Sequence, residues 1–154
     1  MKIVLIILTG LVLAAIVGFF VLGLMSQSGQ ANGLSAGRLT ECPDKPNCVC
    51  SEYPSDASHY SPSIDFLQTL TSNPLSDLKN IVRAMGGNIQ TEQENYFAAS
   101  FTSSIFRFVD DLEIRLDPDQ KMIHLRSASR VGHSDRGVNR KRIEQLKNKY
   151  ALLG

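Results

Sequence analysis

The sequence predicts an α+β protein with an N-terminal transmembrane helix, followed by a small antiparallel sheet of about four strands with two helices packed on one face. Three observations support this fold class. An apolar run at residues 3–25 precedes a polar remainder. Four segments between residues 88 and 127 have strand-like composition. Segments with helical spacing stand on either side of them, which is typical of helices covering an antiparallel sheet.

Residues 3–25 contain no charged side chain and are long enough to cross about 30 Å of hydrocarbon as a helix. Only Lys2 and the α-amino group precede the run, and the next basic residue is Arg38. This asymmetry favours an N-terminus inside and the rest of the chain outside. A single-pass inner-membrane protein with a periplasmic domain is therefore expected.

The apolar run is longer than the hydrophobic region of most cleaved signal peptides, which is about 7–15 residues. Its length favours a permanent signal anchor. Small residues at 29–31 and 35–37 leave open a cleaved and secreted form. The predicted division is an anchor at 1–25, a flexible Gly/Ser-rich tether at 26–40 and one extracytoplasmic α+β domain at 41–154.

Charge is segregated along the chain although the net charge is only +1. Residues 26–125 carry 7 Lys/Arg against 13 Asp/Glu, a net of −6. Residues 126–154 carry 8 Lys/Arg against 2 Asp/Glu, a net of +6. Such segregation predicts either internal pairing or a charged binding face.

Three cysteines lie close together in CPDKPNCVC. Thiols oxidise outside the cytoplasm, so a disulfide between Cys42 and Cys48 is predicted, with Cys50 left over. Unpaired thiols are one alternative. Another is a metal held by the three thiols and His59, but their spacing matches no common zinc pattern. No metal site and no cofactor are therefore predicted.

Local signals define the remaining elements. Asn73 and Pro74 are typical of a helix start, apolar residues then recur at helical spacing, and Gly86-Gly87 ends the segment. Strands are expected at 88–92, 96–102, 106–116 and 122–127, and a second helix at 135–150.

A type I turn at 117–120 with Pro118 at its second position would join the last two strands. A four-residue loop then sets the cross-strand partners. They are Ile114 with Ile123, Leu112 with Leu125, Asp111 with Arg126, and Glu113 with His124. The register puts apolar pairs on the helix side and charged pairs on a face left open to solvent.

Three stretches, CPDKPNCV, FRFVDDLEIRLD and RSASRVGHSDRGVNRKRIE, together resemble an uncharacterised bacterial and chloroplast family called domain of unknown function 1499. The resemblance spans about residues 37–147. Members of that family are typically exported or membrane-anchored, which implies the same for this chain. The sequence departs from the family pattern at Cys50, where serine is more common.

Acidic residues in the third predicted strand require partners. Asp110 falls on the apolar side, where a carboxylate needs a hydrogen bond or ion pair, with Ser127 or Arg130 as candidates. An outward bulge and a catalytic or ligand role are the alternatives. Asp111, Glu113 and His124 are predicted to form structural ion pairs; the alternative is a metal-dependent hydrolase that uses this cluster.

The stretch after the last strand is the strongest functional candidate. Its expected ligand-binding residues are Arg126, Ser129, Arg130, Ser134, Arg136, Asn139 and Arg140. Arginine donors beside a helix N-terminus suit an anion. The competing interpretation is an Arg-rich loop tied by ion pairs to the acidic sheet.

No catalytic residues are assigned, because neither a phosphate-loop nor a G-x-S-x-G spacing occurs. Nucleic acid is disfavoured because no aromatic platform accompanies the charge. The sequence therefore predicts a membrane-anchored extracytoplasmic binding or assembly module. Its expected partners are the membrane and an anionic lipid, an envelope polymer or an envelope protein.

Overall fold

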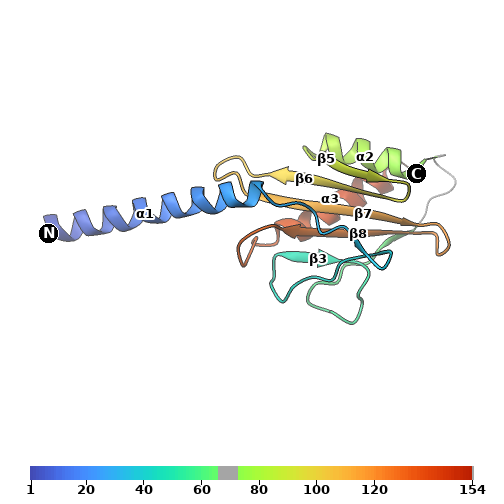
Figure 1. Cartoon of the computed structure of the whole chain (residues 1–154), viewed down its shortest axis with the longest axis horizontal. Coiled ribbons are helices and arrows are strands. Elements are labelled where there is room, and N and C mark those ends of the chain that lie inside the picture. The colour runs from blue at the N-terminus through green and yellow to red at the C-terminus, as the bar shows by residue number, and fades with distance from the viewer. Residues whose placement is uncertain (66–72, 154) are drawn as a thin grey trace.

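The computed structural model describes residues 1–65 and 73–153. A single long helix, α1 (Lys2–Gln27), projects from an α+β domain (Figure 1). Among the described residues it is the one helix long and apolar enough to cross a membrane, and its most apolar window is not buried against the domain. The expected N-terminal apolar helix is confirmed, as either an anchor or a signal sequence.

The domain is built on a six-stranded antiparallel sheet, larger than the four strands expected. Five strands follow one another in space as β3 (Cys48–Cys50), β8 (Met122–Ser129), β7 (Val109–Asp117), β6 (Tyr96–Thr102) and β5 (Asn88–Gln93). The sixth, β4 (Ile64–Asp65), pairs with β8. A separate two-stranded sheet joins β1 (Leu34–Ser35) to β2 (Arg38–Leu39). The additional strands are two or three residues long, too short to show a periodic pattern.

Two helices, α2 (Pro74–Ala84) and α3 (Val138–Ala151), pack on one face of the sheet, as expected. Asn73 caps α2, and its side-chain oxygen accepts a hydrogen bond from the Ser76 amide at 3.1 Å. Helix and sheet side chains form the main core, whose fully buried members are Leu78, Val82, Phe97, Ala99, Leu112, Ile114, Ile123, Leu125, Ile143 and Leu146. We call this the apolar face.

The opposite side of the sheet, here called the polar face, is not open to solvent as the sequence had suggested. A second buried cluster there contains Leu39, Cys50, Tyr96 and Ala98. It is closed by the segment at residues 31–53, which returns along the sheet after α1. The predicted tether and domain boundaries remain a prediction, but residues in the tether range make contacts that a free linker would lack.

The predicted register of the β7–β8 hairpin is wrong by two residues. Ile114 pairs with Leu125, Glu113 with Arg126, and Arg115 with His124. The cause is Lys121, which has a left-handed backbone (φ 56°) and joins the loop, so that Asp117 pairs with Met122. A shift of two leaves every side chain on its predicted face and changes only its partner.

The strand expected at 106–116 begins instead at Val109. Arg107 has φ 62°, which interrupts the extended chain. Phe106 and Phe108 therefore belong to the β6–β7 loop and pack against α1, rather than lying in the core.

Candidate functional site

A buried ion pair lies at the centre of the polar face. Arg126 Nη1 donates to Glu113 Oε2 at 2.7 Å, and the two side chains are 3% and 0% exposed. The second carboxylate oxygen of Glu113 accepts the Tyr96 hydroxyl at 2.9 Å and the Gly33 amide at 2.8 Å. Burial and the neighbouring Glu113 charge raise the pKa of Tyr96, so this hydroxyl keeps its proton and serves as a donor.

A second ion pair joins the same face to α1. Arg130 donates to Asp111 with two nitrogens, Nε to Oδ2 at 2.8 Å and Nη2 to Oδ1 at 2.7 Å. The remaining nitrogen, Nη1, lies 3.3 Å from the carbonyl oxygen of Ser26 at the end of α1. The two-pronged geometry fixes the guanidinium plane.

These contacts correct the predicted partners. Asp111 pairs with Arg130 and Glu113 with Arg126, because the register differs by two residues. His124 contacts neither acid. Its Nδ1 lies 3.3 Å from Ser51 Oγ, and burial lowers the pKa of His124. The predicted cluster of Asp111, Glu113 and His124 is thus divided among three different partners.

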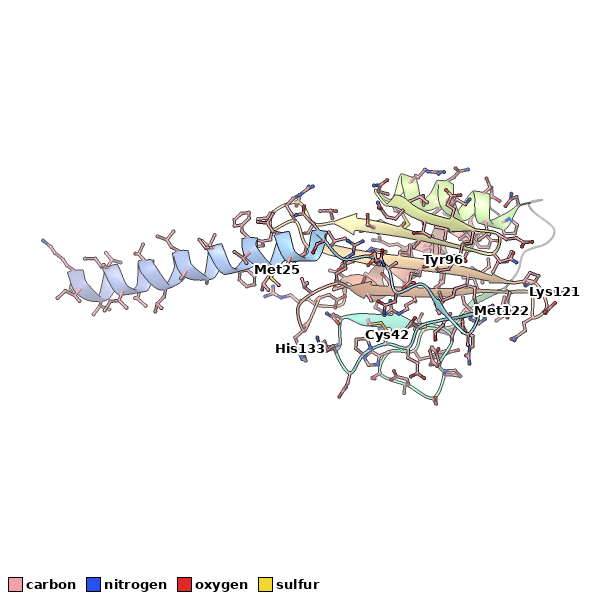
Figure 2. All side chains as sticks on the ribbon, viewed as in Figure 1. Met25, Cys42, Tyr96, Lys121, Met122 and His133 are labelled. Atoms are coloured by element: carbon pink, nitrogen blue, oxygen red, sulfur yellow. A yellow bond between two sulfur atoms is a disulfide. The ribbon has the colours of Figure 1, made fainter. Side chains whose placement is uncertain are left out.

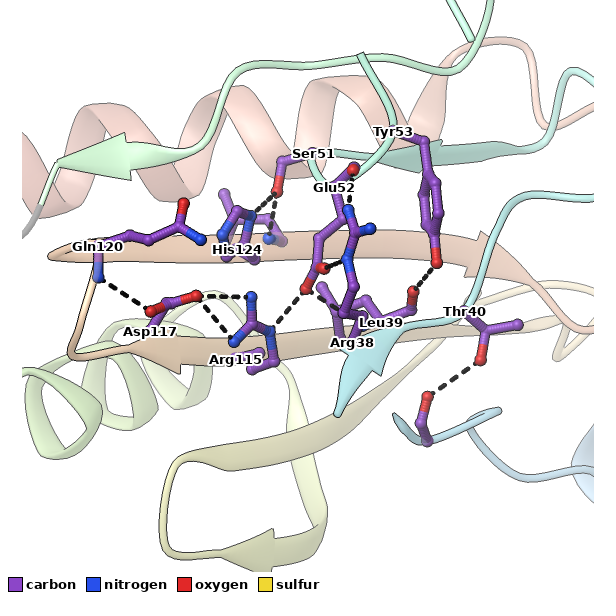
Figure 3. A network of polar contacts seen from close by, with 12 residues as sticks. Arg38, Leu39, Thr40, Ser51, Glu52, Tyr53, Arg115, Asp117, Gln120 and His124 are labelled. Atoms are coloured by element: carbon purple, nitrogen blue, oxygen red, sulfur yellow. Dashed lines mark hydrogen bonds and ion pairs between the residues drawn. The ribbon is translucent and has the colours of Figure 1, made fainter. Parts of the chain in front are cut away.

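Glu52 organises a further network on the polar face (Figure 3). Its carboxylate accepts from Arg115 Nε at 2.6 Å, Arg38 Nε at 2.7 Å and the Leu39 amide at 3.1 Å. Burial by itself would raise the pKa of Glu52, but the hydrogen bonds from Arg115 and Arg38 outweigh it and lower the pKa. The network binds the chain around β2 to the C-terminal part of β7.

Asp110 lies on the apolar face, as predicted, but with other partners. Ser129 Oγ donates to Asp110 Oδ1 at 2.6 Å, and Arg142 Nη2 donates to Oδ2 at 2.7 Å. Arg142 lies over the Phe101 ring, 4.5 Å from its centroid. The expected partners had been Ser127 and Arg130; the register explains the first difference, and the second arises because Arg130 lies on the polar face.

The residues predicted to bind an anion do not converge on one point. Asn139 is buried and bonds Ser127, Ser129 and Asn47, while Arg140 donates to the carbonyls of residues 58 and 60. The N-terminus of α3 is capped by Asp135, whose carboxylate accepts the amides of Gly137 and Asn139 at 2.9 and 2.6 Å. Ser134 and Arg136 are exposed. The helix N-terminus thus already carries a carboxylate from the chain itself.

Arg126 and Arg130 instead line a cavity of about 390 Å³ between the polar face and the chain that leaves α1. We call it the Arg126 cavity. Its charged lining residues are Glu41, Lys45, Asp111, Arg126 and Arg130, and its other lining residues include Gly29, Gln30, Asn32, Asn47, Ser129 and Gly132. Arg126 Nε is buried and has no hydrogen-bond partner in the described part of the chain. This unpaired donor lies beneath the cavity surface, in a residue that lines the cavity.

The cysteines behave as predicted. Cys42 and Cys48 form a disulfide, and Cys50 is a buried free thiol whose pKa is raised by burial. A raised pKa keeps the thiol protonated and unreactive. His59 contacts Asp56 and the carbonyl of Lys45. Within residues 1–65 and 73–153, no group of three or more His, Cys, Asp or Glu residues is placed to hold a metal.

Several residues of the site have no clear signal in the sequence. Ser51 and Glu52 lie in a short irregular segment, and Arg142 could be read as part of a solvated helix surface. Gly23 and Ser26 were assigned to the anchor and tether, with no expectation that they contact the domain. Tyr96 is an exception, because a tyrosine buried in a strand needs a hydrogen-bond partner for its hydroxyl.

The fold and the site define a class of protein: an α+β domain with one antiparallel sheet, attached to an N-terminal apolar helix and containing a polar cavity beside that attachment. Comparison with known families places the chain more closely. The sequence profile of a family described as a protein of unknown function, DUF1499, matches residues 38–149, and the chain belongs to that family. No curated protein and no solved structure matches the chain significantly.

Proposed function

We propose that this protein is a membrane-anchored binding module that holds a phosphate group at the outer membrane surface in the Arg126 cavity. The proposal combines two parts, an anchor formed by α1 and a site formed by Arg126 and its neighbours. Each part has its own support and its own test.

Contacts between α1 and the domain support a retained anchor. Ser26 Oγ accepts the Val109 amide at 3.1 Å, and its own proton is directed to the Gly23 carbonyl at 2.6 Å. Arg130 also bonds the end of α1 through the Ser26 carbonyl. Cleavage at 29–31 or 35–37 would remove all of these contacts. With Lys2 ahead of the helix, the domain would lie outside.

The unused donor of Arg126 is the observation that carries the binding site. A buried donor without a partner costs roughly 1–3 kcal/mol, which a bound acceptor would recover. Arg126 cannot turn away, because its Nη1 is held by Glu113. Because Nε is buried, an oxygen acceptor would reach it by displacing the atoms that cover it, and it would leave that ion pair intact.

A phosphate group is the acceptor that best suits the surroundings. The cavity lining carries three basic and two acidic side chains, and Lys45 has no ion-pair partner within 4.0 Å among the described residues. Gly29 and Gln30, which follow α1 directly, form one wall. A site so close to the end of an anchor would lie at the level of the lipid headgroups.

A metal-dependent hydrolase is not favoured. Asp111 and Glu113 already accept arginine hydrogen bonds, and His124 lies beside Ser51. These three side chains are paired apart from one another, so together they offer no common point for a metal and a substrate.

The test replaces Arg126 with lysine in the full chain, held in dodecyl maltoside micelles, which contain no phosphate. Arg126→Lys retains a positive charge for Glu113 but removes the Nε donor. Arg115→Lys is the matched control, because Arg115 also donates its Nε to a buried carboxylate, Glu52, but lies away from the cavity. Thermal unfolding midpoints are measured in these micelles without addition, with added inorganic phosphate, and with added phosphatidylglycerol or phosphatidylethanolamine.

Ligand that binds only the folded protein raises its unfolding midpoint. We expect phosphate or a phospholipid to raise the midpoint of the parent protein and of Arg115→Lys, but not that of Arg126→Lys. A response to lipid alone would identify a headgroup ligand, and a response to inorganic phosphate would identify a soluble one. Equal responses in Arg126→Lys and the parent, or no response in any sample, would overturn the proposed site.

A further inference from the structure

The β6–β7 loop, residues 103–108, lies beside the C-terminal end of α1 (Figure 1). The Phe106 ring is 5.2 Å from the rings of both Phe19 and Phe20, measured between centroids. Phe108 lies 6.4 Å from Phe19 and 6.3 Å from Phe106. The neighbouring Ile105 is 69% exposed. The domain therefore presents an aromatic and aliphatic loop against the apolar helix.

The backbone of the loop is fixed against α1 by small residues. A Cβ atom added to Gly23 would lie 1.7 Å from the carbonyl oxygen of Phe106, so only glycine allows this approach. Ser26, one turn later, bonds the Val109 amide at the start of β7. At its base the loop is closed by Ser103, whose amide and hydroxyl bond Phe108. The loop cannot change its depth along α1 without breaking these contacts.

The length of α1 sets that depth. Its 26 residues span about 39 Å at 1.5 Å per residue, whereas the hydrocarbon core is about 30 Å thick. About 20 residues from Ile3 would fill the core, which ends near residue 22. Phe19 and Phe20 then lie in the last turn inside the hydrocarbon. Phe106, which contacts both rings, is brought to the boundary between hydrocarbon and headgroups.

We propose that the β6–β7 loop inserts into the outer interface of the bilayer that α1 spans. Ile105 and Phe106 enter the acyl-chain boundary, and the exposed Arg107 meets the anionic headgroups. Aromatic rings and arginine are well suited to this layer, because each combines an apolar part with affinity for the polar one. The inference rests on the anchoring part of the proposed function and is independent of the Arg126 cavity.

The sequence contains no tryptophan, so a single introduced tryptophan reports its own depth. Three variants of the full chain are placed in phosphatidylcholine vesicles that contain lipid brominated either near the headgroup or near the acyl-chain end. Ile105→Trp probes the loop, Leu11→Trp probes the middle of α1, and Gln120→Trp probes the distant β7–β8 turn, beside Lys121 in Figure 2. The measurement is fluorescence quenching by each lipid.

We expect Trp at 105 to be quenched mainly by the shallow bromines, Trp at 11 mainly by the deep bromines, and Trp at 120 by neither. Quenching at 11 without quenching at 105 would overturn the loop inference and leave the anchor standing. Absence of quenching at 11 would overturn the anchor, and the loop inference with it. Quenching at 120 to the same extent as at 105 would also contradict insertion through this loop.

A second pair of variants tests the fixed depth. Gly23→Ala in the Ile105→Trp background forces the loop away from α1, so quenching at 105 should fall. Gly18→Ala is the control, because a Cβ atom there meets nothing within 4 Å. The same glycine changes in the Leu11→Trp background should leave deep quenching unchanged. Equal quenching at 105 in Gly23→Ala and Gly18→Ala would contradict a depth set by this contact.

Discussion

On the apolar face of the sheet, Ile114 and its neighbours are buried against leucine, isoleucine and tyrosine side chains of α2 and α3. On the polar face, Glu113, the adjacent residue in β7, is equally buried but among an arginine, a tyrosine hydroxyl and a backbone amide. Figure 2 shows Tyr96 on the sheet, between α1 and the far hairpin.

Ile114 and Glu113 differ in the interactions that stabilise them when they are buried. Apolar contacts are non-directional, and each lost methyl group has a limited cost. Charged groups require particular partners, so removing one of a pair leaves the other buried without compensation. The buried charges of the polar face should therefore be conditional on pairing and on pH, while the aliphatic core around Ile114 should depend on side-chain volume.

The largest effect is expected from separating the buried pair. Glu113→Leu leaves Arg126 without its carboxylate and should lower the free energy of unfolding by about 3–5 kcal/mol. The double variant Glu113→Leu/Arg126→Met should recover most of that loss, since neither charge remains. Urea unfolding of the full chain in detergent, followed by tyrosine fluorescence, measures both. If the double variant has the same free energy of unfolding as Glu113→Leu, the loss does not come from leaving Arg126 buried without its partner.

A somewhat smaller effect is expected on the other face. Ile114→Ala should cost about 3 kcal/mol through lost burial and an unfilled cavity, and Ile114→Val about 1 kcal/mol. No second substitution of a neighbour, such as Leu125→Ala, should restore stability. The same urea measurement applies, and recovery in the double variant would remove the contrast between the faces.

Glu52 should make stability depend on pH in the acid range. Because its pKa is lower in the folded protein than in the unfolded chain, its contribution is present above about pH 4.3 and is lost as the pH falls through the folded pKa. Glu52→Gln should lower the free energy of unfolding by about 2 kcal/mol at pH 7. It should also make the free energy of unfolding less dependent on pH in the acid range. Ile114→Ala should lower the free energy of unfolding by the same amount at every pH. Urea unfolding at a series of pH values would test both expectations.

The smallest effect should come from His124. Burial lowers its pKa in the folded protein, so the unfolded chain takes up a proton first as the pH falls below about 6.5. Stability should therefore be full above that value and decline between there and the folded pKa. In His124→Asn this decline should be reduced relative to the parent between pH 5 and 7. If the free energy of unfolding changes with pH in the same way in His124→Asn and in the parent, His124 has no such effect.

Elements with strong local signals were predictable from the sequence. The Asn73-Pro74 start of α2 and the bounds of β6 agree with the structure, because capping chemistry and strand composition act within a few residues. The Cys42–Cys48 disulfide was also predictable from the cysteine spacing and the expected compartment. The face of each β7 and β8 side chain followed from alternation, which a register shift of two does not disturb.

The partners of those side chains could not be obtained in the same way. Lys121 adopts a left-handed conformation without the glycine or asparagine that usually indicates one, and this residue alone changes every cross-strand pair. Closure of the polar face depends on two- and three-residue strands, which have no period. The Arg126 cavity depends on both. Part of its wall comes from residues between 29 and 47 that flank these short strands, and the register of β7 and β8 sets where Arg126 lies.

The attachment at Gly23 and Ser26 has a mechanical consequence. Because α1 meets the domain through close backbone contacts rather than through a flexible linker, α1 and β7 should move together as one rigid body. A bilayer that is thinner or thicker than α1 prefers changes the tilt of such a helix. In the anchored protein proposed above, bilayer thickness would therefore set the position of the β7–β8 turn, at the other end of β7, relative to the membrane.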